Sequence, residues 1–421
     1  MLTRSLIPKG PLRWTRPGLP YRRCMAHVSN ISDLPTEDTK PFSVPIADDS
    51  FETYNLDPPP YSLETTKSQL KQLYHDMSLI RSLSLPLPSL PITIVPVPQI
   101  NFPRRLELAA DKLYKEQKVR GFCHLSTGQE AVAVGVEHGI SPEDKVITAY
   151  RAHGFTLMRG GSVKSIIGEL LGRRDGICHG KGGSVHMFTK NFYGGNGIVG
   201  SNVPLGTGIA FAQQYDDTKK VTVNLYGDGA ANQGQVHEAY NMAKLWELPV
   251  IFGYNKYGMG TSVERASAMT EYYKRGYYIP GLRINGMDVL AVIAAMKYGK
   301  DYVLGGNGPL LYEFQTYRYA GHSVSDPGTA YRTKDEVQAE RAHDPITTYR
   351  EKLIEWGVFS DDEAKTMDKE IRRKVDREAQ EAEKMAEPPL TSDVLFEDVY
   401  VRGSEPAQRR GRTVDETYYL G

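Results

Sequence analysis

The chain has 421 residues, of which 40% are hydrophobic and 24% are charged, and its formal net charge is +0. A chain of this length can bury one large core or two smaller ones. Because there is no excess of positive charge, the composition indicates neither nucleic acid nor an anionic membrane surface as a partner. Three cysteines at unrelated spacings favour a reduced compartment over a disulfide framework or a structural zinc site.

The first 32 residues differ in composition from the rest of the chain. No acidic residue comes before Asp33, and six basic residues do: Arg4, Lys9, Arg13, Arg16, Arg22 and Arg23. A basic segment without a continuous apolar core is typical of a mitochondrial transit peptide rather than a secretory signal. We therefore predict a transit peptide over residues 1–32 and an extended arm over residues 33–60. A disordered basic tail is the alternative.

A proline-rich segment, Ser82–Arg104, interrupts the first helical pattern. It contains six prolines and no acidic residue, so it is too rich in proline to form a helix or to span a membrane as one. When it is left out, seven flanking apolar residues share one helical face: Leu70, Leu73, Met77, Ile80, Leu106, Ala110 and Leu113. The pattern predicts an anomalous insert, over residues 82–104, in one amphipathic helix. The insert is either a docking loop or the product of a faulty gene model.

Apolar runs and helical patterns alternate along the remaining chain. We predict strands over residues 145–151, 221–225, 248–255 and 308–318, and helices after Thr127, within residues 201–215 and over residues 235–246. From Asp335 onward the chain is charged and helical, most clearly over residues 361–386. The alternation predicts a doubly wound, mostly parallel α/β sheet flanked by helices. Its domain would cover residues 61–334, with a helical C-terminal region and tail over residues 335–421.

In the stretch "LYGDGAANQGQ", Asp228 stands between two glycines where a predicted strand ends. In open α/β sheets, ligands bind at the carboxyl ends of the strands. The glycines allow the backbone to approach a ligand, and the helix that follows offers free N–H groups to an anion. A carboxylate beside an anion site indicates a bridging cation.

The stretch "GNGIVG", residues 195–200, matches the GxGxxG dinucleotide pattern. The match is weak, because no strand leads directly into it and no acidic residue ends a second strand at the required distance. Two interpretations remain: the glycines permit tight helix packing, or they approach a different diphosphate.

Gly227-Asp228-Gly229, followed by Asn255 at the end of the next predicted strand, resembles the fingerprint of thiamine diphosphate enzymes. Mg²⁺ takes a near-octahedral set of oxygen ligands and shares it with phosphates. The resemblance implies that Asp228 supplies a carboxylate, Asn255 an amide oxygen and Tyr257 its main-chain carbonyl to Mg²⁺.

Longer stretches, among them "GFCHLSTGQEA", "HGKGGSVHMF", "YGMGTSVERA" and "QTYRYAGHSVSDPGTAYRT", resemble the alpha subunits of mitochondrial pyruvate dehydrogenase. The resemblance implies a thiamine diphosphate-binding fold with thiamine diphosphate and Mg²⁺ as cofactors. It implies that His322 and His124 are catalytic and that the guanidinium of Arg151 binds oxygens of the diphosphate in a bidentate manner. The cofactor or substrate site would contain His124, Tyr150, Arg151, Gly197, Val199, Asp228, Gly229, Ala230, Asn255, Tyr257 and His322.

The family resemblance also implies partners, location and control. It implies an α₂β₂ heterotetramer with a beta subunit, located in the mitochondrial matrix, that decarboxylates pyruvate and reductively acetylates a lipoyl group for acetyl-CoA formation. The further partners would be the lipoyl domain of the acyltransferase component, a regulatory kinase and a phosphatase. Ser323 and Ser262 are the expected phosphorylation sites, while Ala330 stands where the family has another regulatory serine.

One strand end departs from the family pattern. The family has Glu-Asn-Asn before Lys/Arg-Tyr-Gly, whereas "FGYNKYG" has Tyr254 before a single Asn255 and is two residues shorter. Two alternative functions therefore stay open. One is the alpha subunit of a branched-chain 2-oxo acid or acetoin dehydrogenase, and the other is an inactive product of a faulty gene model.

Overall fold

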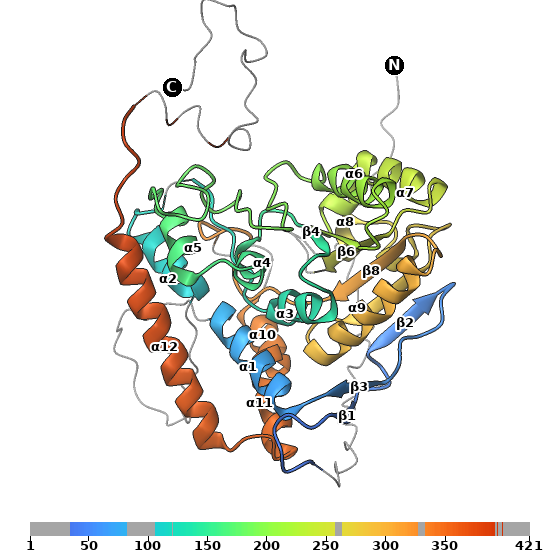
Figure 1. Ribbon diagram of the computed structural model, residues 1–421, viewed down its shortest axis with the longest axis horizontal. Coiled ribbons are helices and arrows are strands. Elements are labelled where there is room, and N and C mark those ends of the chain that lie inside the picture. Colours follow the sequence, from blue (N-terminus) through green and yellow to red (C-terminus); the bar gives the residue numbers. More distant parts are fainter. Residues whose placement is uncertain are drawn as a thin grey trace, which may run out of the picture.

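Figure 1 shows a computed structural model of the chain. The structure describes residues 34–81, 106–119, 121–256, 263–326, 333–391, 394 and 398. The predicted transit peptide, the insert Ser82–Arg104 and the residues Tyr257, Ser262 and Ala330 lie outside this part of the chain.

Six strands form the main sheet in the order β2-β7-β8-β6-β5-β4. The parallel strands are β4 (Lys145–Ile147), β5 (Thr222–Gly227), β6 (Val250–Lys256), β7 (Gly281–Asn285) and β8 (Leu310–Gln315). Their apolar side chains are buried on both faces, as parallel sheets require. The predicted mostly parallel α/β sheet is confirmed. The strand predicted over residues 145–151, which is β4, ends at Ile147 rather than at Tyr150–Arg151, because the chain turns there toward the helix that begins at His153.

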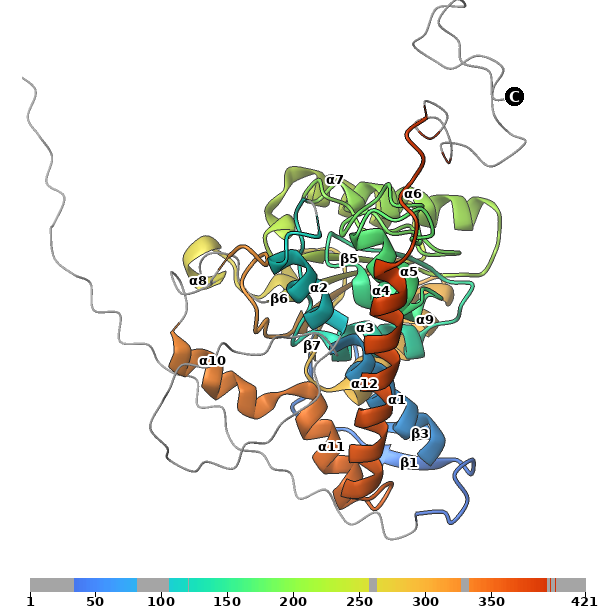
Figure 2. The same ribbon diagram turned by 90° about the vertical axis from the view of Figure 1, so that its left-hand side faces the viewer.

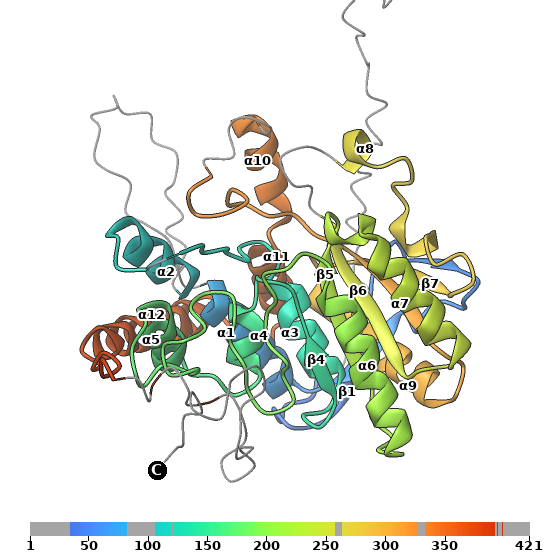
Figure 3. The same cartoon turned by 90° about the horizontal axis from the view of Figure 1, so that it is seen from above.

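Helices cover both faces of the sheet (Figures 1 and 2). On one face lie α6 (Asn202–Tyr215) and α7 (Gly234–Leu245), which run side by side along β5 and β6 in Figure 3. On the other lie α3 (Glu130–Gly139) and α9 (Val289–Leu304). The last two pack closely because glycine removes side-chain bulk: a Cβ atom at Gly135 would lie 2.6 Å from the Val292 side chain.

The N-terminal arm takes part in the folded core. Its first strand, β1 (Phe42–Pro45), pairs with β3 (Ser62–Thr65) in a separate two-stranded sheet. Its second strand, β2 (Phe51–Tyr54), joins the edge of the main sheet antiparallel to β7. The predicted domain boundaries at residues 61 and 335 stay predictions.

The helices on the two sides of the insert bury the faces that the sequence predicts. Leu70, Leu73, Met77 and Ile80 of α1 (Lys67–Arg81) are buried, as are Ala110 and Leu113 of α2 (Leu106–Lys115). The two helices pack against each other. These buried faces agree with the prediction that the insert interrupts a single helix. The interruption itself stays a prediction.

The C-terminal region is helical, as predicted. It contains α10 (Lys334–Glu340), α11 (Pro345–Glu355) and the long α12 (Asp361–Glu383). In Figure 1, α12 runs along the left-hand side of the molecule, where it packs against α5 (Val163–Leu170) and α1. Shorter helices are α4 (His153–Met158) and α8 (Val263–Ala266). No helix in the described ranges is long and apolar enough to cross a membrane.

Candidate functional site

The predicted site residues come from segments that follow neighbouring strands. Tyr150 and Arg151 follow β4, Asp228 follows β5, Asn255 lies at the end of β6, and His322 belongs to the segment after β8. The four strands are parallel, so their carboxyl ends meet at one edge of the sheet.

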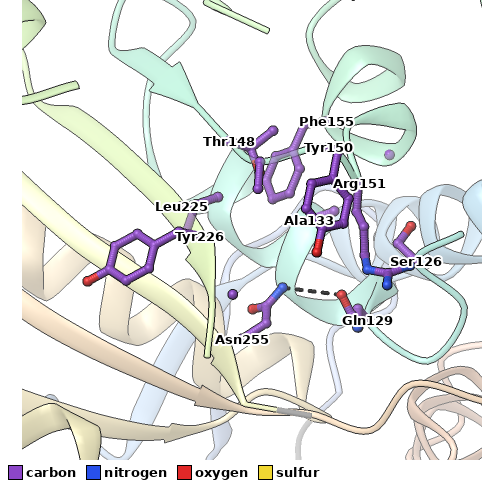
Figure 4. A pocket seen from close by; sticks show the side chains of 13 residues that line it. Ser126, Gln129, Ala133, Thr148, Tyr150, Arg151, Phe155, Leu225, Tyr226 and Asn255 are labelled. Atoms are coloured by element: carbon purple, nitrogen blue, oxygen red, sulfur yellow. Dashed lines mark hydrogen bonds between the residues drawn. The ribbon is translucent and has the colours of Figure 1, made fainter. Parts of the chain in front are cut away.

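A pocket opens at this edge (Figure 4). It contains about 470 Å³ of empty space, part of it open solvent. The polar side chains that line it include Ser126, Gln129, Thr148, Tyr150, Arg151 and Asn255. The pocket therefore connects the end of β4 with the ends of β5 and β6.

Three rings gather beside Arg151. The ring centroids of His124 and Tyr150 are 4.4 Å apart, those of His124 and His322 are 5.2 Å apart, and those of Tyr150 and His322 are 6.0 Å apart. The structure thus brings the two predicted catalytic histidines together, although they are distant in sequence. Both are half-buried, so a substrate can still reach them.

Arg151 holds the segment that carries His322. Its Nη1 atom donates a hydrogen bond to the Leu125 carbonyl oxygen and its Nη2 atom to the His322 carbonyl oxygen, each at 2.6 Å. Only 7% of Arg151 is exposed. In this structure the guanidinium connects the backbone segments of Leu125 and His322 beside the pocket. Its bidentate binding of a diphosphate stays a prediction.

The segment after β8 forms a tight turn around Ser323. The backbone N–H of His322 donates to Asp326 Oδ2 at 2.7 Å, and the backbone N–H of Asp326 donates to the Ser323 carbonyl oxygen at 3.1 Å. The hydroxyls of Ser323 and Ser325 lie 2.8 Å apart. Ser323 is therefore in the same small turn as His322.

The Gly-Asp-Gly turn lies directly beside Asn255. Gly227 is opposite Asn255 in the register of β5 and β6, and the buried Asp228 comes next. Gly229 and Ala230 lead into a short 3₁₀ helix, Ala230–Asn232. Arg275 supports this turn from outside, because its Nη1 atom donates to the Ala231 carbonyl oxygen at 3.1 Å.

The donor set at this turn fits a hard cation. The Oδ1 atom of Asn255 is buried, and no residue in the described part of the chain gives it a hydrogen bond. That part also contains no group of three or more His, Cys, Asp or Glu side chains that could hold a metal ion. A metal bound here would therefore use one carboxylate with amide and carbonyl oxygens, which is the ligand chemistry of Mg²⁺.

The glycine-rich loop of residues 195–200 lies against the same region. An added Cβ atom at Gly200 would lie 2.9 Å from the Gln233 side chain, close to the Gly-Asp-Gly turn. An added Cβ atom at Gly197 would lie 3.8 Å from the His186 ring, and 41% of Val199 is exposed. The loop leads directly into α6, where the backbone N–H of Val203 donates to the Gly200 carbonyl oxygen at 3.1 Å and Pro204 has no N–H.

Comparison with known proteins agrees with this geometry. The family model described as "Dehydrogenase E1 component" matches residues 99–391. The alpha subunit of the mitochondrial pyruvate dehydrogenase E1 component from Chaetomium thermophilum is 60% identical over 392 residues, which are 92% of this chain and 90% of that protein. The Saccharomyces cerevisiae subunit is 50% identical over 94% of this chain and 91% of its own length. The human somatic form is 57% identical over 72% and 79%.

The chain belongs to the alpha subunits of the pyruvate dehydrogenase E1 component. The resemblance seen in the sequence is confirmed, and so is the mitochondrial location, since these relatives are named mitochondrial. As an E1 alpha subunit the chain has a thiamine diphosphate-binding fold.

Tyr254, where this E1 alpha subunit departs from the family pattern, is firmly held. Its side chain is 1% exposed, and its hydroxyl donates to Glu313 Oε2 at 2.7 Å. The same oxygen accepts the backbone N–H of Tyr273 at 3.1 Å. The shorter strand end therefore has a hydrogen-bonded anchor of its own, and Asn255 still reaches the pocket.

The polar pocket residues of this E1 alpha site that were not predicted include Ser126, Gln129 and Thr148. Gln129 is the most informative, because its Oε1 atom accepts a hydrogen bond from Asn255 Nδ2 at 3.3 Å (Figure 4). The signal in the sequence is the polar pair Gln129-Glu130 at the start of an otherwise apolar helix, because such side chains are buried mainly where they have hydrogen-bond or charged partners.

The two histidines should make the stability of the chain depend on pH. Burial, together with the nearby Arg151, lowers the pKa of His124 to about 3 and that of His322 to about 4, from an ordinary value of 6.5. Between pH 6.5 and about 4 the unfolded chain therefore binds more protons than the folded chain, and folding stability should fall as the pH falls. When Tm is measured at several pH values, it should fall less steeply below pH 6.5 for His124→Gln and His322→Gln than for the wild type. His237→Gln, on an exposed position of α7, is the control and should show the same dependence of Tm on pH as the wild type.

Proposed function

We infer that this chain is the alpha subunit of a thiamine diphosphate-dependent pyruvate dehydrogenase. With a beta subunit it decarboxylates pyruvate and transfers the acetyl group to a lipoyl group of the acyltransferase component. The observation that carries this proposal is that Tyr150 and Asn255 line one pocket, with the rings of His124 and His322 beside Tyr150. The pocket lies in a chain that is 60% identical to a named pyruvate dehydrogenase E1 alpha subunit.

Membership of the E1 family implies thiamine diphosphate, and the donor set supports Mg²⁺ beside it. Asp228 would supply a carboxylate oxygen and Asn255 its buried Oδ1 atom, with the carbonyl of Tyr257 as the third expected ligand. Gly229, Ala230, Gly197 and Val199 would place backbone groups against the diphosphate. When it is bound, thiamine diphosphate supplies the electron sink that decarboxylation requires.

The residues of this chain would orient the substrate and move protons. Both histidines are neutral at neutral pH, because their pKa values are lowered far below 6.5 by burial and by Arg151. A neutral imidazole can donate one hydrogen bond and accept another, so His124 and His322 can hold the oxygens of a 2-oxo acid and exchange a proton with them. The Nδ1 atom of His124 is buried and has no hydrogen-bond partner in the described part of the chain.

The pocket supplies only half of a thiamine diphosphate site. No acidic side chain lines it in the described part of the chain, whereas the cofactor's aminopyrimidine ring is activated by a glutamate in enzymes of this kind. We therefore propose that a beta subunit contributes that glutamate, in the α₂β₂ arrangement that the family resemblance implies.

An exposed apolar surface lies on the C-terminal parts of α6 and α7, at the opposite end of these helices from the ligand edge, and suits a subunit contact. Phe211 lies between Tyr215 of α6 and Trp246 at the end of α7; its ring centroid is 6.5 Å from that of Tyr215 and 5.5 Å from that of Trp246. Leu245 has the helical spacing of the buried residues of α7, but 70% of it is exposed. Contiguous apolar surface of this kind marks subunit contacts.

We expect the purified chain alone to release no CO₂ from pyruvate, and the chain co-expressed with its beta subunit to release it. The measurement is CO₂ release with an artificial electron acceptor, in the presence of thiamine diphosphate and Mg²⁺. Full activity without the partner would contradict the proposal. Equal or greater activity on branched-chain 2-oxo acids or acetoin would favour the alternative dehydrogenases, and an inactive complex would favour the faulty gene model.

A further inference from the structure

Gln129 lies beside the proposed cation site without belonging to the predicted ligand set. It is the residue before α3, is 3% exposed, and donates its backbone N–H to the Ser126 carbonyl oxygen at 2.9 Å. Its Oε1 atom accepts a hydrogen bond from Asn255 Nδ2. Figure 4 shows the two amide groups facing each other across the pocket.

Each of these amides has one further buried polar atom, which the hydrogen bond between them does not satisfy. Asn255 Oδ1 and Gln129 Nε2 are both buried, and neither has a hydrogen-bond partner in the described part of the chain. Leaving a buried polar atom unsatisfied costs about 1–3 kcal/mol, so a native protein normally supplies a partner. Here the leftover atom on Asn255 is an acceptor, which a cation satisfies.

An amide side chain can turn over and exchange its oxygen with its nitrogen. With the opposite orientation, Asn255 would present an NH₂ group, which repels a cation. In the orientation seen here, Gln129 Oε1 accepts the hydrogen bond from Asn255 Nδ2 and so stabilises the orientation that leaves Asn255 Oδ1 for the cation.

The position of Gln129 is itself held by a buried ion cluster. The neighbouring Glu130 is fully buried, accepts the backbone N–H of Gly128 at 3.0 Å, and is paired with Arg81 of α1. Arg81 Nε donates to Glu130 Oε1 at 2.7 Å, and Arg81 is also paired with Asp344 at the start of α11. The turn that presents Gln129 is therefore tied to two further helices.

We propose that Gln129 is a positioning residue for Asn255, which it holds in the orientation that offers Oδ1 to the cation. The proposal rests on the cation site of the proposed function. It assigns to Gln129 no contact with the metal, only the choice of which Asn255 atom faces it. Removal of the Gln129 amide should therefore weaken Mg²⁺ binding and leave the fold in place.

The test uses the complex of this chain with its beta subunit and measures the rise in Tm with Mg²⁺ concentration at a fixed thiamine diphosphate concentration. We expect Gln129→Met, which keeps the length of the side chain and removes both amide atoms, to raise the half-saturating Mg²⁺ concentration about tenfold, the scale of one hydrogen bond. Gln129→Glu keeps an acceptor for Asn255 Nδ2 and should stay within about threefold of the wild type. Gln213→Met, which alters another buried glutamine in α6, is the matched control and should not change the Mg²⁺ response.

Asn255→Asp provides the decisive comparison, because both carboxylate oxygens are acceptors and orientation no longer matters. In that background Gln129→Met should have little further effect on the half-saturating concentration. An undiminished tenfold effect there, or no effect of Gln129→Met in the wild-type background, would overturn the proposal. A wild-type complex with no Mg²⁺ response and no CO₂ release would instead overturn the proposed function, so the two failures are distinguishable.

Discussion

Asp228→Asn should lower the turnover of the reconstituted enzyme by about 100-fold or more while the fold stays intact. The substitution keeps the shape of the side chain and removes its negative charge. Asp228 is 5% exposed and lies next to Asn255 at the end of β5. A buried carboxylate is the strongest ligand that this edge can offer to Mg²⁺, and its charge offsets that of the cation.

Steady-state turnover and the half-saturating Mg²⁺ concentration should be measured together. The loss should shrink as the Mg²⁺ concentration rises, because the amide oxygen of the variant is still a weak ligand. Asp301→Asn, the same chemical change on an exposed position of α9, should leave both quantities unchanged. Wild-type turnover of Asp228→Asn would show that the carboxylate holds no catalytic cation.

Ser323→Glu should reduce the turnover of the complex by about 10- to 100-fold, whereas Ser323→Ala should remain active. Ser323 shares a turn with His322, in which Asp326 accepts the backbone N–H of His322 at 2.7 Å. A second carboxylate in this turn would repel Asp326, and its bulk would disturb the contact between the Ser323 and Ser325 hydroxyls. His322 would then leave its position beside His124 and Arg151.

The same reasoning makes Ser323 the main regulatory site that we propose for a kinase and a phosphatase. A phosphate adds a charge of about −1.5 to −2 at neutral pH, more than a glutamate does. Incubation with a kinase and ATP should inactivate the wild-type complex and spare Ser323→Ala. Ser262 is proposed as a second, weaker site, and it lies outside the described residues. A fully active Ser323→Glu enzyme would show that this turn is not the switch.

Much of this protein could be predicted from local sequence patterns. The strands end where runs of Val, Ile and Leu meet glycine or a polar residue, and the helices follow the period of 3.6 residues. Asp228 and Asn255 could be placed at the carboxyl ends of neighbouring strands because both signals lie within a few residues of them. The alternation of strands with helices was then sufficient to predict a parallel sheet with its ligand edge.

Other features depend on how distant segments pack, which no local pattern encodes. Gln129 meets Asn255 across 126 residues of sequence, and Arg151 meets His322 across 171. Leu245 has the spacing of a buried residue on α7, yet the other exposed apolar residues of α6 and α7 make it part of a surface.

The sequence by itself determined the fold class, the family and the residue types at the ligand edge, because these follow from short-range periodicity and from contiguous motifs. Only the tertiary structure decided which side chains touch. The contact between Gln129 and Asn255 requires α3 to approach the end of β6, and that approach depends on close packing of α3 against α9 through Gly135 and Gly139. Packing of this kind depends on the shapes of several elements at once, so local sequence patterns do not predict it.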